Sequence, residues 1–332
     1  MKICIGDFGE RVRANMSRKR YCFAWLFYPS VAGDAQHKYD YLYGSIVNCH
    51  ILRDFFGSAN GRAVCQVKDD DDVDFCVITP DGLGEDLDDM IALHFGVHVA
   101  YSRPVWAHFL ERSEREWSAD ERARWSGVMN KLFLWHPDLF GGYEKVVYLD
   151  SDMLIMDVAR YARLLVDYET PAGVYEQSNI CKHNSKKGQL LVKAFKQNQI
   201  IPAKCCTAGT LFYHCVNASL YVLRATEEDY EKMRAEMSSH SVLVRRHPQL
   251  ARHVLYFPEQ EYLTNFFAGR WHAVDRRMLG TTTTSCQIAG RFWENVDFDR
   301  RTGVPNMCRV LFGADGDSGT SRKSEREFDT EA

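Results

Sequence analysis

The chain has 332 residues, of which 45% are hydrophobic, so it can bury the core of one large α/β domain or of two small ones. Its formal net charge of -4 excludes an overall basic field that would hold nucleic acid or an anionic membrane surface. The apolar run at 21–28 has only eight residues, whereas a membrane span needs about 20. No apolar signal segment precedes it, so we expect a cytoplasmic protein without a membrane span.

The eleven cysteines are odd in number and scattered, and no two of them form a C-x-x-C pair. Several lie inside apolar runs, where a free cysteine packs as a small hydrophobic residue. Structural zinc would need clustered ligands. The pattern therefore predicts reduced thiols.

Strands and helices alternate in the first half of the chain. In order, the patterns predict a strand at 21–28, a helix at 43–57, a buried strand at 73–80, a helix at 85–95 and a short strand at 98–105. The helices end at Gly57 and Gly96. This β-α-β-α-β order predicts an α/β fold with a mostly parallel sheet covered by helices on both faces.

The second half is less regular. It predicts a long helical segment at 120–139, a strand at 145–149, a strand at 209–215, capped helical turns within 217–237 and a helix at 259–269. No internal repeat divides the chain. We therefore expect an N-terminal arm (1–19), a single domain (20–313) and a disordered tail (314–332), whose residues offer almost nothing apolar to bury.

Two acids interrupt the apolar stretch "VVYLDSDMLIM" at Asp150 and Asp152. Asp-x-Asp occurs elsewhere in the chain, but only this pair follows four apolar strand residues and precedes another apolar run. In an extended chain, residues i and i+2 point the same way, and ligands of such sheets bind at the carboxyl ends of the strands. The pair is therefore expected to face a ligand.

A divalent cation would explain this placement of the acids. Two carboxylates about 4 Å apart repel each other by roughly 4 kcal/mol near a protein surface, so a positive charge should lie between them. Mg²⁺ and Mn²⁺ prefer hard oxygen ligands and accept carboxylates completed by water and phosphate oxygens. The alternative is structural, in which the acids cap a helix at 156–165.

Two classes of enzyme use a strand that ends in Asp-x-Asp. In the haloacid-dehalogenase type of phosphatase the pair follows the first strand, whereas at least three strands come earlier here. The second class is the nucleotide-sugar transferases of GT-A type. At this point the chain resembles the glycogenin-like family 8 glycosyltransferases, in order over most of residues 20–295, through "YDYLYGSIV", "FCVITPDGL", "MNKLFLW", "VVYLDSDMLIM", "CCTAGTLFY" and "FPEQEYLTNFF".

The resemblance implies a single GT-A domain with a Rossmann-like sheet and a set of functional residues. It implies that Tyr41 stacks on the nucleotide base, that Lys131 lines the donor site, and that Asp150 and Asp152 bind Mn²⁺ or Mg²⁺, with Ser151 also at the donor. It further implies that Glu259 and Gln260 face the reacting side of the sugar. The chain has Glu259 where the family has Asp.

A larger departure concerns the third metal ligand. The family's motif His-x-x-Gly-x-x-Lys-Pro-Trp has its best counterpart in residues 287–293, "QIAGRFW", which lack both the His and the Lys. Gln287 can still offer an oxygen to the metal, and Gly290 with Arg291 could hold the diphosphate. His272 is an alternative ligand.

The resulting prediction is a retaining, metal-dependent transferase that moves a sugar from a UDP-sugar to an acceptor that the sequence does not specify. A binding or scaffold protein that keeps the fold without its third metal ligand stays open as the alternative. The phosphatase is the less favoured one.

Overall fold

The computed structural model describes residues 18–28, 40–101, 118, 125–155, 157–178, 195–206, 213–248, 250, 258–278 and 285–287. The chain divides into two compact units, Met1–Glu294 and Asn295–Ala332, and every described residue belongs to the first. Most of the predicted arm and all of the predicted tail lie outside the described residues.

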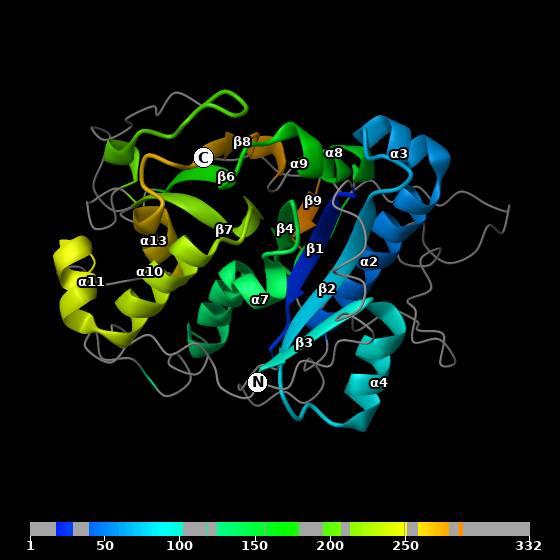
Figure 1. Ribbon diagram of the computed structural model, residues 1–332, viewed down its shortest axis with the longest axis horizontal. Coiled ribbons are helices and arrows are strands. Elements are labelled where there is room, and N and C mark those ends of the chain that lie inside the picture. Colours follow the sequence, from blue (N-terminus) through cyan, green and yellow to red (C-terminus); the bar gives the residue numbers. More distant parts are fainter. Residues whose placement is uncertain are drawn as a thin grey trace, which may run out of the picture. The chain divides into compact units, whose positions relative to one another are not determined.

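A seven-stranded sheet organises the described residues (Figure 1). Strands β3, β2, β1 and β4 lie side by side and parallel, β7 is antiparallel to both β4 and β6, and β8 is parallel to β6. The predicted α/β class with a mostly parallel sheet is confirmed. The strands are β1 Arg20–Leu26, β2 Asp72–Pro80, β3 Val97–Tyr101, β4 Lys145–Leu149, β6 Ala172–Ser178, β7 Tyr213–Leu223 and β8 His272–Val274.

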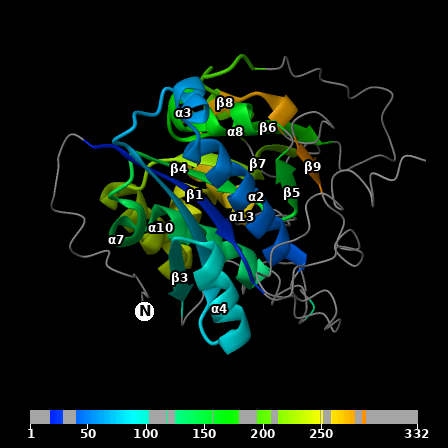
Figure 2. The same cartoon turned by 90° about the vertical axis from the view of Figure 1, so that its right-hand side faces the viewer.

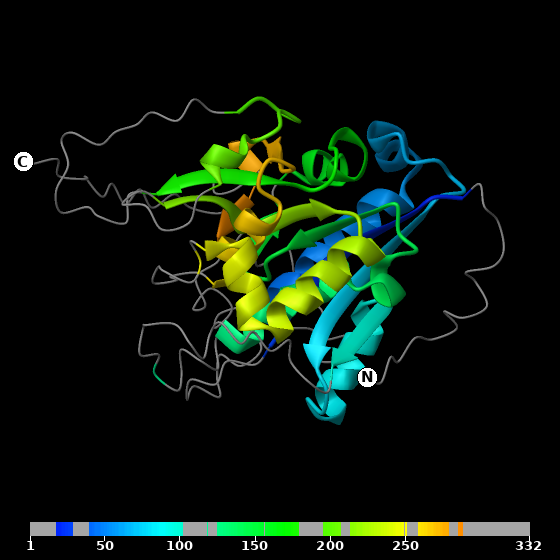
Figure 3. The ribbon, with the colours of Figure 1, turned by 60° about the vertical axis from the view of Figure 1, so that its left-hand side comes forward.

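Both faces of the sheet are buried, because helices cover each of them. The first face packs against α2 Asp40–Gly57, α3 Ala59–Cys65, α4 Glu85–His94, α8 Val158–Ala162 and α9 Leu164–Asp167. The second packs against the 3-10 helix η2 Met129–Trp135 and against α7 Pro137–Phe140, α10 Glu227–Ser238, α11 His240–Arg246 and α13 Pro258–Phe266. Figure 2 looks onto the side of α2 and α4, and Figure 3 brings the yellow helices of the other face forward.

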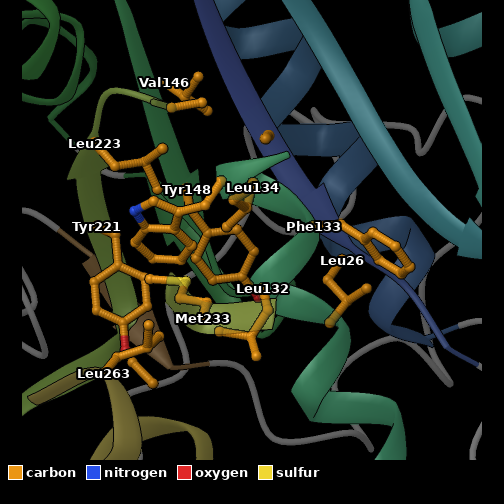
Figure 4. Close-up of a cluster of buried hydrophobic side chains, with 14 of the residues drawn as sticks. Leu26, Leu132, Phe133, Leu134, Val146, Tyr148, Tyr221, Leu223, Met233 and Leu263 are labelled. Atoms are coloured by element: carbon orange, nitrogen blue, oxygen red, sulfur yellow. The ribbon is translucent and has the colours of Figure 1, made fainter. Parts of the chain in front are cut away.

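Strand β1 shows why its sequence reads as one continuous apolar run. Phe23 and Trp25 belong to the core on the α2 side, whereas Ala24 and Leu26 belong to the core on the α13 side. Successive strand side chains point to opposite faces, and a strand buried on both faces needs apolar residues at every position. Part of the α13-side core is shown in Figure 4.

Two predictions for the second half need correction. Residues 217–223 are strand rather than helical turns, because β7 pairs with β4 on one side and β6 on the other; helix α10 begins only after its N-cap Thr226. The helix expected at 120–139 is interrupted within its described part, since His136 is extended before Pro137. Proline disfavours the helical conformation of the residue before it.

None of the described helices combines the length and the apolar character required to cross a lipid bilayer. The described cysteines form no disulfide with one another: Cys22, Cys49, Cys65, Cys76, Cys205, Cys206 and Cys215.

A second, two-stranded sheet follows the acid pair. Strand β5, Met153–Ile155, pairs antiparallel with β9, Ser285–Gln287. The buried side chain of Asn48, from α2, donates to the Met153 carbonyl at 2.6 Å and accepts from the Ile155 amide at 2.9 Å. Asn48 thus binds the backbone of β5 as a neighbouring strand would, and it anchors the segment that leaves the acid pair.

Replacing Asn48 should therefore destabilise the protein strongly. In Asn48→Ala, two buried backbone groups lose their partner, at about 1–3 kcal/mol each. Chemical denaturation should show a loss several times that of Asp54→Ala, which changes an exposed position of the same helix. Equal losses in the two variants would contradict the anchoring role.

Candidate functional site

The acid pair lies in a tight turn directly after β4. The Met153 amide donates to the Asp150 carbonyl at 3.2 Å, so Ser151 and Asp152 form the corner of this turn. The predicted extended conformation is therefore wrong for this segment, because β4 ends at Leu149 and the chain reverses into β5. The Asp150 amide still continues the ladder to β7 by donating to the Ser219 carbonyl at 2.8 Å.

Hydrogen bonds fix this turn to the carboxyl end of β1 and to the N-terminal part of α2. The hydroxyl of Ser151 donates to the carbonyl of Leu26 at the end of β1 at 3.0 Å. Ser45, in the first turns of α2, reaches Ser151 with an oxygen–oxygen distance of 2.9 Å. The acid turn is thus at the edge of the sheet where ligands of parallel sheets bind.

Three of the residues singled out from the sequence meet beside this turn. Lys131 Nζ lies 2.8 Å from Asp150 Oδ1 and 3.6 Å from Glu259 Oε1, and it donates to the Ala218 carbonyl at 3.1 Å. The side chains of Lys131 and Glu259 are each 5% exposed, whereas that of Asp150 is 25% exposed. Residues from η2, the end of β4 and the start of α13 therefore share one charged cluster.

Lys131 stays charged in this cluster. Burial alone would lower its pKa, but Asp150, Glu259 and Asp152 outweigh burial and raise the pKa above its ordinary value. Lys131 therefore faces three carboxyl groups with one positive charge. If all three acids are ionised, a divalent cation would neutralise the two negative charges that Lys131 leaves uncompensated.

Glu259 ionises less readily than an ordinary glutamate. Burial raises the pKa of its carboxyl group, and the nearby Lys131 only partly opposes this effect. Its Oε1 faces Lys131, whereas its buried Oε2 has no hydrogen-bond partner among the described residues. A buried oxygen without a hydrogen-bond partner lowers the stability of the protein. Oε2 is therefore suited to form a hydrogen bond with a hydroxyl group of a ligand.

Gln260 is buried and makes contacts with the backbone and side chains of β7. Its Oε1 accepts from the Ala218 amide at 2.9 Å, and its Nε2 lies 2.7 Å from Cys215 Sγ. These contacts hold the start of α13 against β7 and so place the neighbouring Glu259. Its role at the sugar stays a prediction.

Sequence reasoning missed Tyr148. Its hydroxyl donates to Asp150 Oδ1 at 2.5 Å, and its ring centroid lies 5.2 Å from Lys131 Nζ. The available signal was its position two residues before Asp150, because side chains at i and i+2 point the same way along an extended chain.

The donor set at the turn fits a divalent cation. Asp150 Oδ2 accepts no hydrogen bond from the described residues, and Asp152 is half-buried two residues later. Among the residues described, no three His, Cys, Asp or Glu side chains form a metal cage. Mg²⁺ and Mn²⁺ sites of one or two carboxylates, completed by water and substrate phosphates, need no such cage.

The structure describes only some of the other residues that were predicted to bind the metal or the diphosphate. Gln287 lies opposite Met153 in the β5–β9 pair, so its backbone is next to the acid turn. Gly290 and Arg291 lie outside the described residues. His272 pairs with Ala172 in β8, three strand positions from β4, or about 14 Å at the usual strand spacing, which is too far to share a metal with Asp150.

Tyr41 lies in the first turn of α2 with 45% of its surface exposed. Ser45, one helical turn later, contacts Ser151, so this end of α2 is next to the acid turn. Stacking of Tyr41 on a nucleotide base stays a prediction that this placement allows.

Known proteins resemble this chain in structure rather than in sequence. No family model matches the chain, and no curated protein matches it. Among solved structures, the chain is similar to the crystal structure of mouse xyloside xylosyltransferase 1 in its apo form, with a TM-score of 0.41 and 10% sequence identity, over 77% of this chain and 85% of that one. At this level of identity, function has to be inferred from the side chains of the site.

Removing the positive charge of the buried Lys131 side chain should destabilise the protein. In Lys131→Met, Asp150 and Glu259 lose their ion pair, and leaving a buried charge without compensation costs about 3–5 kcal/mol. Denaturation at neutral pH should show this loss, whereas Lys232→Met, which breaks an exposed pair with Glu228, should lose far less stability. A similar small loss in both variants would show that Lys131 does not neutralise the cluster.

Glu259 should make stability depend on pH with a defined sign. Because folding raises the pKa of Glu259, the folded state keeps a proton that the unfolded state releases near pH 4. The free energy of unfolding therefore falls as pH rises from the pKa of the unfolded state to that of the folded state. Glu259→Gln removes this dependence. In urea denaturation, the free energy of unfolding of Glu259→Gln minus that of the original protein should therefore increase from pH 4 upward. A constant or decreasing difference would contradict the raised pKa of Glu259.

Proposed function

We propose that the protein is a metal-dependent glycosyltransferase that moves a sugar from a UDP-sugar, with retention of configuration. The observation that carries this proposal is the convergence of Lys131, Asp150 and Glu259 at the carboxyl end of β4. The resemblance of the sequence to family 8 transferases named these three residues from separate motifs. Their meeting in space is what a shared donor site requires.

The charges of the cluster suit a nucleotide diphosphate bound through a cation. The acidic turn would repel a diphosphate by itself, so a divalent ion has to lie between them. In this proposal Asp150, Asp152 and Gln287 hold Mn²⁺ or Mg²⁺. The ion supplies neutralisation of the charge that develops on the leaving diphosphate.

The remaining residues bind and orient the donor. Tyr41 stacks on the uracil base, Ser151 lies in the turn that contacts the donor, and Arg291 with Gly290 holds the diphosphate. Glu259 and Gln260 face the sugar. Its pKa is raised, and its Oε2 has no hydrogen-bond partner among the residues that the structure describes, so Glu259 can form hydrogen bonds with a sugar hydroxyl group. The acceptor's proton passes to the leaving phosphate oxygen.

A binding or scaffold protein without catalysis is the second candidate. Two observations favour it: Lys131 already compensates Asp150, and the side-chain amide of Gln260 is held by β7. A protein of this kind would keep the fold and the charged cluster without needing a metal.

Nucleotide binding separates the two candidates. For the transferase, UDP with Mn²⁺ should raise the melting temperature more than UDP alone, and more than GDP or ADP with Mn²⁺. Asp152→Asn should remove the metal-dependent part and abolish metal-dependent hydrolysis of the donor, because a carboxylate ligand is lost. The matched control Asp54→Asn, on the exposed face of α2, should behave as the original protein.

A melting temperature that no nucleotide changes would favour the scaffold. Unchanged donor hydrolysis in Asp152→Asn would contradict the role of the acid pair.

A further inference from the structure

The two oxygens of the Asp150 carboxylate have different surroundings. Oδ1 accepts the Tyr148 hydroxyl at 2.5 Å and lies 2.8 Å from Lys131 Nζ. No described residue forms a hydrogen bond with Oδ2. The carboxylate is thus held from one side by two donors, and its second oxygen is the one left for a ligand.

The Tyr148 donor is rigid. Its side chain is 1% exposed, and its ring stacks on that of Tyr221, its partner across β4 and β7, with centroids 6.1 Å apart at 30°. Figure 4 shows both tyrosines among buried apolar side chains. A ring fixed in this way can hold its hydroxyl, and the carboxylate bound to it, in one orientation.

The Lys131 donor acts differently from the tyrosine. Its charge is shared between Asp150 and Glu259 at 2.8 and 3.6 Å, and it also bonds the Ala218 carbonyl. Lys131 therefore neutralises part of the negative charge of both acids. The hydroxyl of Tyr148, in contrast, is a neutral donor that forms its hydrogen bond with Asp150, so it contributes direction rather than charge.

We propose that Tyr148 is a positioning residue that holds Asp150 Oδ1, so that Asp150 presents Oδ2 to a divalent cation as a one-oxygen ligand. This inference rests on the proposed function, because it takes a cation at the acid turn as given. Partners that orient a ligating carboxylate typically change metal affinity by about 10–100-fold when they are removed.

The neighbouring tyrosine provides a matched control. Tyr221 is fully buried in the same core, and its hydroxyl has no hydrogen-bond partner among the described residues. Tyr148→Phe and Tyr221→Phe remove the same atom from adjacent strands and keep both rings. A difference between them therefore reports on the contact with Asp150 and not on packing.

The test is a titration of each purified full-length variant with Mn²⁺, with and without UDP, with free Mn²⁺ followed by electron paramagnetic resonance. We expect Tyr148→Phe to raise the Kd for Mn²⁺ about tenfold or more, and Tyr221→Phe to leave it unchanged. An equal Kd in the two variants, with binding intact in the original protein, would overturn the positioning role and leave the proposed function standing.

Absence of Mn²⁺ binding in the original protein would instead overturn the proposed function, and this inference with it. A second measurement needs no metal and guards against a variant that folds poorly. Unfolding equilibria of Tyr148→Phe, Asp150→Asn and the double variant should be non-additive, because each single change breaks the same contact. Additive effects would show that the hydroxyl does not act on Asp150.

Discussion

The buried ion pair between Lys131 and Asp150 is the interaction on which the site depends. A buried charge is tolerated only when it is compensated, so Lys131 has to bring together the elements that carry its partners. Those partners are the end of β4, the start of α13 and the Ala218 carbonyl of β7. The pair thus joins η2 to three segments that are distant in the sequence, and it places Glu259 within 3.6 Å of the same ammonium group.

The sheet explains why this cluster lies where a ligand can reach it. The parallel order of β3, β2, β1 and β4 brings the carboxyl ends of these strands to one edge, and antiparallel β7 then returns beside β4. Ser151 joins the acid turn to the end of β1, and Asn48 binds the strand that leaves the turn. The turn is therefore held from several sides before any ligand binds, which reduces the ordering that binding would require.

Much of the fold could be read from the sequence, because buried parallel strands are apolar at every position and helices end at glycines. The errors have particular causes. Capping residues predicted helical turns within 217–237, but pairing with two neighbouring strands makes residues 217–223 part of β7. Strands β5 and β9 are three residues each, too short to leave a periodic pattern. The acid pair was predicted as extended, although a turn follows β4 at once.

What the sequence by itself determined is the chemistry: an acid pair after a buried strand, a lysine in an apolar helical segment, and a glutamate at the start of a later helix. These residue types predict a site that binds its ligand through charged groups and carboxylate oxygens. Only the tertiary structure decided which atoms meet. Whether Lys131 reaches Glu259, 128 positions later in the chain (259 minus 131), depends on tertiary contacts that no local pattern encodes. Distances of this kind follow from the packing of α13 and η2 against the sheet.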